Sequence, residues 1–341
     1  MRAIKLAVYF IAKTLGLFKV SRRLTAKNPK IICYHGLEVD NESQFRPRLF
    51  MTAKTFAKRM RMLHRLGYKV ISLDRMVKDM LEGKDICDTV TITFDDGFSS
   101  FRTIAAPILR SYSFPSTVYV TTYYVENSTP VFRILIHYLI WQAEPQRIDL
   151  THLSGSLGHY DLASELDRDL LANTIVRHGE LNCDEPGRVK LSAGLAESIG
   201  IDIVDMLSKR QFHLMQPDQL AELKDFQVDI GLHTHRHRFS VLDRDSAMKE
   251  ISDNRNYLKS VGLSHVEHFC YPSGLYTSEQ WQWLNELGVA SSTTCKPGLN
   301  STDTPRHELR RFLDGEDVYQ IEFEAALCGF SDLLLTFSRR V

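Results

Sequence analysis

The stretch TVTITFDDG, residues 89–97, is the part of the sequence that decides the fold. Its first six residues, Thr89 to Phe94, are all β-branched or aromatic, which is typical of a buried strand. Asp95, Asp96 and Gly97 follow at once. Successive side chains on a strand point to opposite sides, but a turn at Gly97 can bring both carboxylates to one cavity. A solvated Asp-Asp-Gly turn is the alternative.

A second polar segment, HTHRH at residues 233–237, also follows directly on a predicted strand, residues 228–232. Imidazole is the commonest neutral nitrogen ligand for metals in proteins. His233 and His237 have the i, i+4 spacing that places two rings on one face if a helical turn begins there, and His235 then points elsewhere. Surface histidines in a polar loop are the alternative.

These two segments together predict a metal site. If both strands belong to one parallel sheet, their carboxyl ends meet at the same edge. One aspartate and two histidines leave coordination positions open for water and substrate, as a catalytic metal requires.

The order of expected elements predicts an α/β fold, because short β-branched runs alternate with helical periods. The expected strands are residues 31–34, 69–71, 89–94, 117–121, 228–232, 266–271, 289–293 and 309–313. The expected helices are residues 55–66, 73–81, 101–111, 217–224, 245–258, 278–287 and 317–327. We predict a distorted (β/α) barrel of about seven strands with a helical insertion and an N-terminal amphipathic helix.

Three parts of the chain follow from this pattern. Residues 1–30 form a basic amphipathic helix, and residues 31–330 form the barrel. Between about 122 and 214 the strand signal disappears, which predicts an inserted helical segment on one barrel loop. Its expected helices are residues 131–141, 162–176 and 195–207. We expect this insertion to cover the cleft and to set the specificity of the site.

The two motifs resemble those of a known family. Thr93 to Gly97 and His233 to His237 are similar to the first two motifs of the polysaccharide deacetylases, carbohydrate esterase family 4, written TFDDG and H-[S/T]-x-x-H. Ile32-Cys33-Tyr34-His35 resembles the opening strand of that family, and Pro115 to Val120 resembles its second core strand. Phe269 to Gly274 resembles the third motif. The similarity spans about Ile31 to Leu313, except the insertion.

The resemblance implies a role for each motif residue. Asp95 would be the general base, while Asp96, His233 and His237 would bind a divalent metal, expected to be Zn2+. The protein would then remove N-acetyl groups from an N-acetylhexosamine-containing glycan, in surface polysaccharide (exopolysaccharide) or lipid-linked glycan biosynthesis. The reaction is hydrolysis of a carbon–nitrogen bond that is not a peptide bond.

The third motif departs from the family pattern. Main-chain N–H groups near Tyr271 and Ser273 are similar to the family's oxyanion site. However, Cys270 stands where the family commonly has an arginine, and Ser273 stands where it has a tyrosine. Arg311, in Leu309-Arg310-Arg311, resembles a late Leu-x-Arg of many members and would supply the missing guanidinium to Asp95. An ordinary surface arginine is the alternative.

The family's general acid has no counterpart in this sequence. Many relatives carry a late histidine in a Leu-x-Leu-His context, and no such motif follows Leu313. His307 is our candidate for the general acid, and His268 is a second candidate. Solvated or hydrogen-bonded histidines are the alternative for both. A catalytically inactive, glycan-binding descendant of the fold therefore remains the second hypothesis for function.

Composition excludes one class of partner. Among 341 residues, 42 Lys and Arg balance 42 Asp and Glu, so no overall basic field marks a nucleic-acid binder. The charge is unevenly placed, because residues 1–36 hold eight basic residues and no acidic one.

The first 20 residues favour peripheral membrane contact. Apolar residues recur there at helical spacing, which predicts one stripe on a basic helix that could lie on an anionic membrane. The stripe consists of Ile4, Val8, Ile11, Leu15 and Phe18. Packing of this stripe on the protein's own body is the alternative.

The expected cellular location is inferred from the cysteines and from the N-terminal segment. The six cysteines are scattered without any short spacing, which argues against disulfides and favours reduced thiols. No convincing export signal is present, so we expect a cytoplasmic protein, peripheral at the inner membrane face. The sequence does not determine the oligomeric state.

Two other enzyme classes are weaker matches. Two histidines and one carboxylate also form the facial triad of iron-dependent oxygenases. In those enzymes a histidine and the acid usually lie within three residues, whereas Asp96 and His233 are far apart. Glycoside hydrolysis needs two carboxylates on either side of a sugar ring, and Asp95 and Asp96 are too close in sequence for that arrangement.

Overall fold

A computed structural model describes residues 2–155 and 157–338 of the chain. The described residues form two compact units. The first unit holds residues 2–38, 42–123 and 217–338, and the second holds residues 39–41, 124–155 and 157–216.

The first unit is built on a parallel sheet of eight strands, as the alternation of elements predicts. Seven strands lie side by side in the order β11, β10, β9, β6, β5, β1 and β12, and β4 pairs with β5. Their bounds are Lys30–Tyr34 (β1), Lys69–Val70 (β4), Thr89–Phe94 (β5), Ser116–Val120 (β6), Val228–Leu232 (β9), His268–Cys270 (β10), Ser291–Thr293 (β11) and Phe312–Leu313 (β12).

The segment 309–313 links the two edges of this sheet. Thr293 of β11 forms a parallel bridge with Leu309, and the N–H of Thr294 donates to the carbonyl of Leu309 over 2.9 Å. Three residues after Leu309, Phe312 pairs with Ile32 of β1. The sheet therefore closes on itself through a short irregular segment, and the prediction of a distorted (β/α) barrel is confirmed.

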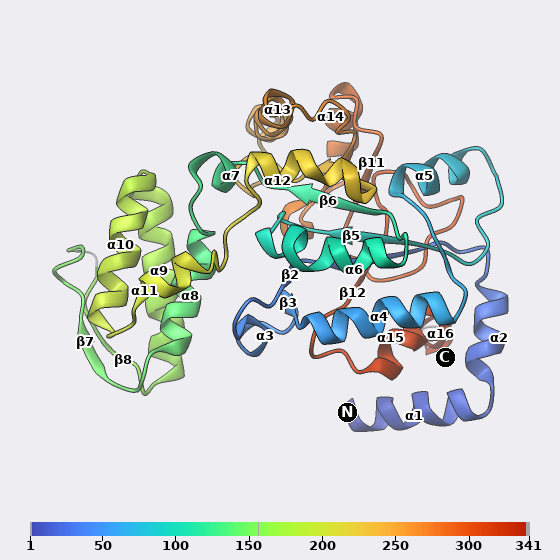
Figure 1. Cartoon of the computed structure of the whole chain (residues 1–341), viewed down its shortest axis with the longest axis horizontal. Helices are drawn as coiled ribbons and strands as arrows, with labels where there is room; N and C mark the ends of the chain where they lie inside the picture. The colour runs from blue at the N-terminus through green and yellow to red at the C-terminus, as the bar shows by residue number, and fades with distance from the viewer. Residues whose placement is uncertain (1, 156, 339–341) are drawn as a thin grey trace. The chain divides into compact units, whose positions relative to one another are not determined.

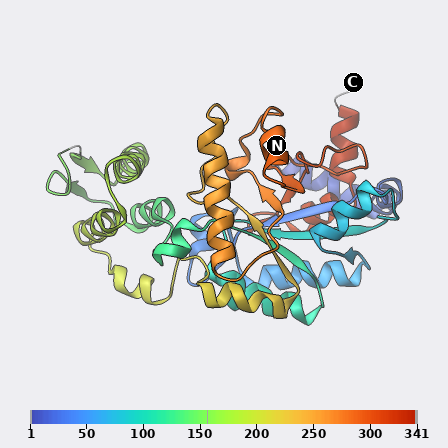
Figure 2. The ribbon, with the colours of Figure 1, turned by 90° about the horizontal axis from the view of Figure 1, so that it is seen from above.

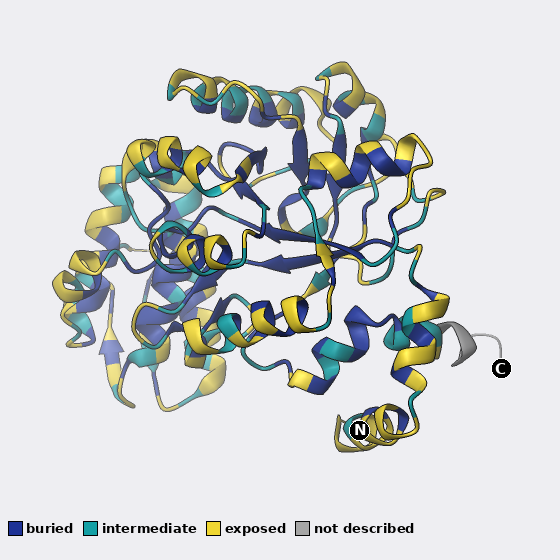
Figure 3. Ribbon diagram, turned by 45° about the vertical axis from the view of Figure 1, so that its right-hand side comes forward, coloured by how far each residue is buried: buried dark blue, intermediate teal, exposed yellow. Residues whose placement is uncertain are grey.

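Helices cover the outside of the sheet, and its strands are largely buried apart from the short strands β4 and β12 (Figures 1 and 3). Phe56 of α4 packs edge-on against Tyr34 and Phe94, which point outward from β1 and β5. Helix α13 stands beside β9 and is seen along its length in Figure 2. The helices are Ala53–Arg65 (α4), Leu73–Leu81 (α5), Ala106–Ser111 (α6), Pro217–Glu222 (α12), Arg244–Ser260 (α13), Gln280–Glu286 (α14), Gln320–Leu327 (α15) and Phe330–Ser338 (α16).

Shorter elements complete this unit. A π-helical turn precedes α6, and 3-10 turns follow α12 and β10. Their bounds are Phe101–Ala105 (η1), Leu223–Phe226 (η2) and Pro272–Gly274 (η3). A two-stranded parallel pair and a one-turn helix lie after β1, with bounds Gly36–Leu37 (β2), Glu42–Phe45 (α3) and Phe50–Met51 (β3).

The N-terminal arm forms two helices instead of one, α1 (Arg2–Thr14) and α2 (Leu17–Leu24). The break falls at Gly16, whose φ of 76° lies in the left-handed region that favours glycine. Both helices lie beside the closing helices, α1 next to α15 and α2 next to α16 (Figure 1). Throughout residues 2–155 and 157–338, no helix combines the length and the apolar character needed to cross a bilayer.

The second unit is mostly helical, as expected, but it also contains a short hairpin that the sequence did not predict. Strands β7 (Arg147–Asp149) and β8 (His159–Asp161) pair antiparallel. The helix expected over residues 195–207 is two helices, because Gly200 at φ 73° ends the first of them. The helices are Tyr123–Asn127 (α7, which begins in the first unit), Phe132–Gln142 (α8), Glu165–Asn182 (α9), Glu185–Ser198 (α10) and Ile203–Ser208 (α11).

Candidate active site

Asp95 and Asp96 follow β5 and turn toward the same side. On a continuing strand they would point to opposite sides, but Asp96 has a φ of 71° and Gly97 a φ of 87°. The left-handed turn therefore begins one residue earlier than we expected. The carbonyl of Asp96 accepts a hydrogen bond from the N–H of Thr121, which follows β6, and this contact holds the turn against the neighbouring strand end.

His233 and His237 come together without a helix. Residues 233–237 form a bend, and Thr234 and His237 have φ values of 62° and 55°. The Thr234 hydroxyl accepts from the N–H of Arg238, which closes the bend. The two rings lie 4.9 Å apart, so the pair predicted from the spacing forms, although the helical turn that we invoked for it is wrong. His235 points elsewhere and bonds the Thr122 hydroxyl.

Asp96, His233 and His237 form a cluster at this edge of the barrel. The Oδ1 atom of Asp96 lies 3.3 Å from Nε2 of His233 and 3.5 Å from Nε2 of His237. All three ligand atoms lie within 4.8 Å of one another. One carboxylate oxygen and two imidazole nitrogens are a donor set that suits Zn2+ with positions left open.

The orientation of His233 supports this fit. Its Nδ1 lies 2.9 Å from the carbonyl of Cys270 at the end of β10, which fixes the proton on Nδ1. The Nε2 lone pair is then directed at Asp96 and available to a cation, the arrangement usual for metal-binding histidines. The N–H of His233 also donates to the side-chain oxygen of Asn254 on α13.

The cluster can bind either a cation or a proton. Burial opposes protonation of His233, but neighbouring Cys270 and Asp96 outweigh burial and raise the pKa of this ring. Burial lowers the pKa of His237, which favours its neutral, ligating form. Burial also opposes ionisation of Asp96, yet the two histidines hold its pKa below the usual value. Metal affinity should therefore fall in acid, where protons compete for the same nitrogen.

Asp95 is held in a buried ion pair with Arg311. The guanidinium donates to both carboxylate oxygens, over 2.6 and 2.8 Å, and both side chains are almost fully buried. Burial disfavours the charged carboxylate, but the adjacent guanidinium outweighs burial and holds the pKa of Asp95 well below its usual value. Arg311 lies in the segment that closes the barrel, and its Nε also donates to the carbonyl of Thr294.

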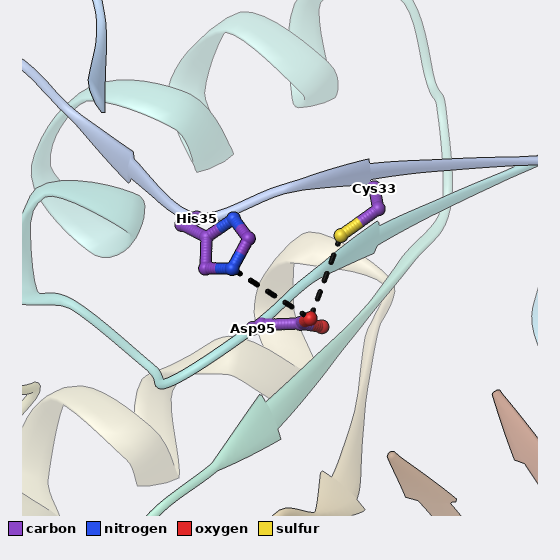
Figure 4. Close-up of side chains that lie close together, drawn as sticks. All are labelled: Cys33, His35 and Asp95. Atoms are coloured by element: carbon purple, nitrogen blue, oxygen red, sulfur yellow. Dashed lines mark hydrogen bonds and ion pairs between the residues drawn. The ribbon is translucent and has the colours of Figure 1, made fainter. Parts of the chain in front are cut away.

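Two thiols and one further histidine surround the same carboxylate. Cys33 and Cys270 each place their sulfur 3.5 Å from Oδ2 of Asp95. His35, which directly follows β1, points toward that oxygen at 3.8 Å, and Figure 4 shows it on the same side as Cys33. The Nδ1 of His35 is buried and has no hydrogen-bond partner within the described residues. Burial raises the pKa of Cys33, so its thiol is neutral.

The structure does not bring His307 to this cluster. Its Nδ1 contacts the hydroxyl of Ser292, and its Nε2 lies 2.8 Å from the side-chain oxygen of Asn285 on α14. Both ring nitrogens are therefore engaged away from the two aspartates. The second candidate, His268, lies at the start of β10, the opposite end of that strand from Cys270, and contacts the hydroxyl of Ser291.

The two residues expected near an oxyanion differ in their surroundings. Tyr271 is buried, stacks on Tyr276, and donates its N–H to the carbonyl of Thr293 and its hydroxyl to that of His307. The N–H and the hydroxyl of Tyr271 are therefore both engaged within the protein, so neither is available to an oxyanion. Ser273 is exposed in the turn after β10 and has a φ of 57°.

His35 and Asn254 are the residues that the sequence argument missed. His35 follows a strand directly, just as Asp95 does, so its position was available as a signal. Asn254 is fully buried on α13 and connects three segments, since it binds the N–H of His233 and donates to the Val120 carbonyl and the Thr122 hydroxyl. No local pattern distinguishes this asparagine from any other in a helix.

A sequence model of one family matches the chain. The family is described as polysaccharide deacetylase, and the match covers residues 82–156 and 194–292. A search among curated proteins finds no match.

Several solved structures share the fold. A Streptococcus pyogenes deacetylase, PplD, in complex with acetate superposes with a TM-score of 0.59 at 16% identity, covering 88% of this chain and 98% of that one. A de-N-acetylase from Aggregatibacter actinomycetemcomitans gives a TM-score of 0.56 at 14% identity, covering 88% and 99%. IcaB from Ammonifex degensii gives 0.55 at 16% identity, covering 89% and 97%.

Proposed function

The chain belongs to the polysaccharide deacetylase family, and on that premise we propose that it is a metal-dependent hydrolase that removes N-acetyl groups from an N-acetylhexosamine-containing glycan. The observation that carries this proposal is the cluster of Asp96, His233 and His237 beside a separate carboxylate, Asp95. Family membership supports deacetylation of a glycan. The choice of an N-acetylhexosamine as the substrate sugar, the dependence on a metal and the biosynthetic pathway are our proposals.

Asp96, His233 and His237 would hold a divalent cation, which we propose to be Zn2+. When bound there, such an ion supplies Lewis-acid polarisation of the acetamide carbonyl. The carbonyl of Cys270 fixes the tautomer of His233 that such binding needs. Asp95 is free of this donor set and remains ionised through Arg311, so it is the carboxylate able to take a proton from the attacking water.

His35 is the group that we propose as the proton donor to the departing amine. A carboxylate whose pKa is held as low as that of Asp95 accepts a proton only weakly and gives it up readily. His35 lies 3.8 Å from Asp95, and its buried Nδ1 has no partner within the described residues. The ring nitrogen that faces Asp95 is Nε2, and we propose that this atom would take the proton from the carboxylate and give it to the substrate nitrogen. The main-chain N–H at Ser273, in the exposed turn after β10, is the proposed oxyanion contact.

Acetate release from defined N-acetylated glycans, measured during a titration with Zn2+, tests the function. We expect release to depend on the metal. Asp95→Asn should lower the rate by about 10² to 10⁴-fold while the metal content, measured by mass spectrometry, stays the same. Asp303→Asn, which alters an exposed carboxylate, is the matched control and should leave the rate unchanged.

A fully loaded site that releases no acetate from any of these glycans would favour the second hypothesis, a glycan-binding protein without turnover. We also propose a cytoplasmic location and a lipid-linked or surface-polysaccharide intermediate as substrate. Cell fractionation that finds the protein in the periplasm, with about the first 30 residues removed, would contradict that location.

A further inference from the structure

Helix α1 packs on the closing helices through one side only. Tyr9 and Ala12 on this side are buried in a cluster with Ile321, Ala325 and Cys328 of the α15 region. The ring of Tyr9 also packs edge-on against Phe330 of α16. This side of the helix is therefore covered by the protein itself.

The basic residues of α1 are exposed but reach acidic side chains of the helix on which α1 packs. Arg2 and Lys5 form ion pairs with Glu322 over 3.0 and 3.1 Å, and Lys13 pairs with Glu324 over 2.5 Å. An ordinary surface helix directs its apolar stripe inward and its charges to water. Helix α1 departs from this pattern in one respect, since Arg2, Lys5 and Lys13 pair with the acids of α15 while still being 49%, 51% and 45% exposed.

The predicted apolar stripe accordingly faces outward. Ile4, Val8, Ile11 and Leu15 are 70%, 40%, 59% and 70% exposed, at spacings that place them in one row. Phe18, the fifth member of the predicted stripe, is buried because the chain breaks at Gly16. Single exposed apolar residues are common, whereas a continuous row of them indicates a surface that meets another apolar phase.

Helix α2 adds free positive charge next to more exposed apolar side chains. Leu17, Val20 and Leu24 are 43%, 50% and 70% exposed. Lys19 and Arg23 are exposed on α2 and have no ion pair within the described residues, and the same holds for Lys27 just beyond it. Residues 1–36 contain no acid that could neutralise them.

We propose that α1 and α2 seat the protein on the surface of an anionic lipid bilayer. The apolar row of α1 would enter the boundary between headgroups and acyl chains, and Lys19, Arg23 and Lys27 would contact lipid phosphates. A second copy of the chain is a poorer occupant, because it would bring a second set of unpaired cations toward the first. This contact goes beyond the proposed reaction and does not depend on it.

Co-sedimentation of the full-length protein with lipid vesicles tests the proposal. We expect binding to phosphatidylcholine vesicles that contain about 30% phosphatidylglycerol, weakening as salt rises above about 0.1 M. Ile4→Gln, Ile11→Gln and Leu15→Gln together should reduce the partition coefficient at least tenfold, because three exposed apolar side chains are lost. Removing the charges of Lys19, Arg23 and Lys27 should reduce it by roughly fivefold per residue on anionic vesicles.

Matched variants separate this surface from general effects. Leu166, Leu170 and Leu181 on α9 are 78%, 57% and 68% exposed, and their change to Gln should leave binding as it was. Arg177, Lys190 and Lys259 are exposed basic residues elsewhere, and their change to Gln removes the same charge without altering binding. All substituted side chains are exposed, so thermal unfolding should remain at the same temperature in each variant.

A fluorescence measurement provides a second readout. A tryptophan introduced by Ile11→Trp should shift its emission to the blue when anionic vesicles are added, while one introduced by Leu170→Trp should not. Equal binding of the Gln triple variant of α1 and the unchanged protein would overturn the proposal. So would vesicle-independent dimerisation that the same triple variant abolishes, because the surface would then be an interface between copies.

Discussion

Two kinds of ion pair in this protein show what burial does to the same chemistry. Arg311 and Asp95 meet inside the barrel with side chains only 2% and 4% exposed, whereas Lys13 of α1 is 45% exposed where it meets Glu324 of α15. The contact distances are similar, at 2.6 and 2.5 Å. Water screens the outer pair and would solvate either partner left alone. Neither partner of the inner pair has that alternative.

Of these two pairs, only the buried one is suited to serve a reaction. A buried guanidinium holds a carboxylate ionised and fixes its direction, because the carboxylate has few other positions available. The outer pairs of α1 fix the helix only loosely against α15, each contributing little. The same residue types thus make a reactive group in one region and a surface attachment in the other.

The largest expected effect is that of Arg311→Ala. It leaves the Asp95 carboxylate buried and unpaired, so we expect unfolding to become easier by about 3 to 5 kcal/mol, together with loss of acetate release. Arg310→Ala, which alters the exposed neighbour, is the control and should cost under about 0.5 kcal/mol. Denaturant unfolding measures both. Adding Asp95→Asn to the Arg311 variant should restore part of the lost stability, and equal unfolding midpoints for all variants would remove the distinction between the two regions.

A buried histidine gives the next largest effect, and it depends on pH. Burial lowers the pKa of His307 to about 4, whereas the unfolded chain has the ordinary value of about 6.5. Between these values the unfolded chain binds the proton more tightly, so stability is lost as pH falls from 6.5 to 4, by up to about 3 kcal/mol. His307→Gln should flatten this part of the pH profile, measured by denaturant unfolding. A rate of acetate release that collapses in this variant would contradict a purely structural role.

A smaller effect is expected from Asn254→Ala, which removes the side chain that joins His233 to β6. The loss of buried hydrogen bonds should cost about 1 to 3 kcal/mol. Metal affinity should fall by about 10- to 100-fold, because the backbone of His233 is no longer held. Titration with Zn2+ measures the second effect. Asn173→Ala, which alters an exposed asparagine of α9, is the control. Equal metal affinities for the two variants would show that Asn254 does not position the site.

The smallest effect is expected at the exposed ion pair between α1 and α15. Lys13→Gln removes one exposed ion pair and should change the free energy of unfolding by less than about 0.5 kcal/mol. The difference should vanish as salt rises, since exposed charges are screened. Thermal unfolding at two salt concentrations measures it. A cost above about 1 kcal/mol would mean that α1 is held as firmly as the barrel interior.

The sequence predicted the parts of the fold that have a local pattern. Residues 89–94 and 228–232 form β5 and β9 with those bounds, and residues 73–81 form α5. The break at Gly16 and the split at Gly200 were missed, because the periodicity of apolar residues continues across each glycine. The hairpin of β7 and β8 was missed because three-residue strands carry almost no periodic signal.

The candidate site likewise contains residues that the sequence could predict and residues that it could not. Sequence by itself determined which side chains follow β5 and β9, because residue type and spacing are local properties, and those side chains were assigned to a metal and a base. The family resemblance suggested Arg311 as the partner of Asp95 and left a surface arginine as the alternative, and the tertiary structure decided between them. Only the tertiary structure decided that His35 lies beside this pair and that His307 does not. These pairings depend on strand order and on the closure through residues 309–313, and such contacts between distant segments leave no periodic trace in the chain.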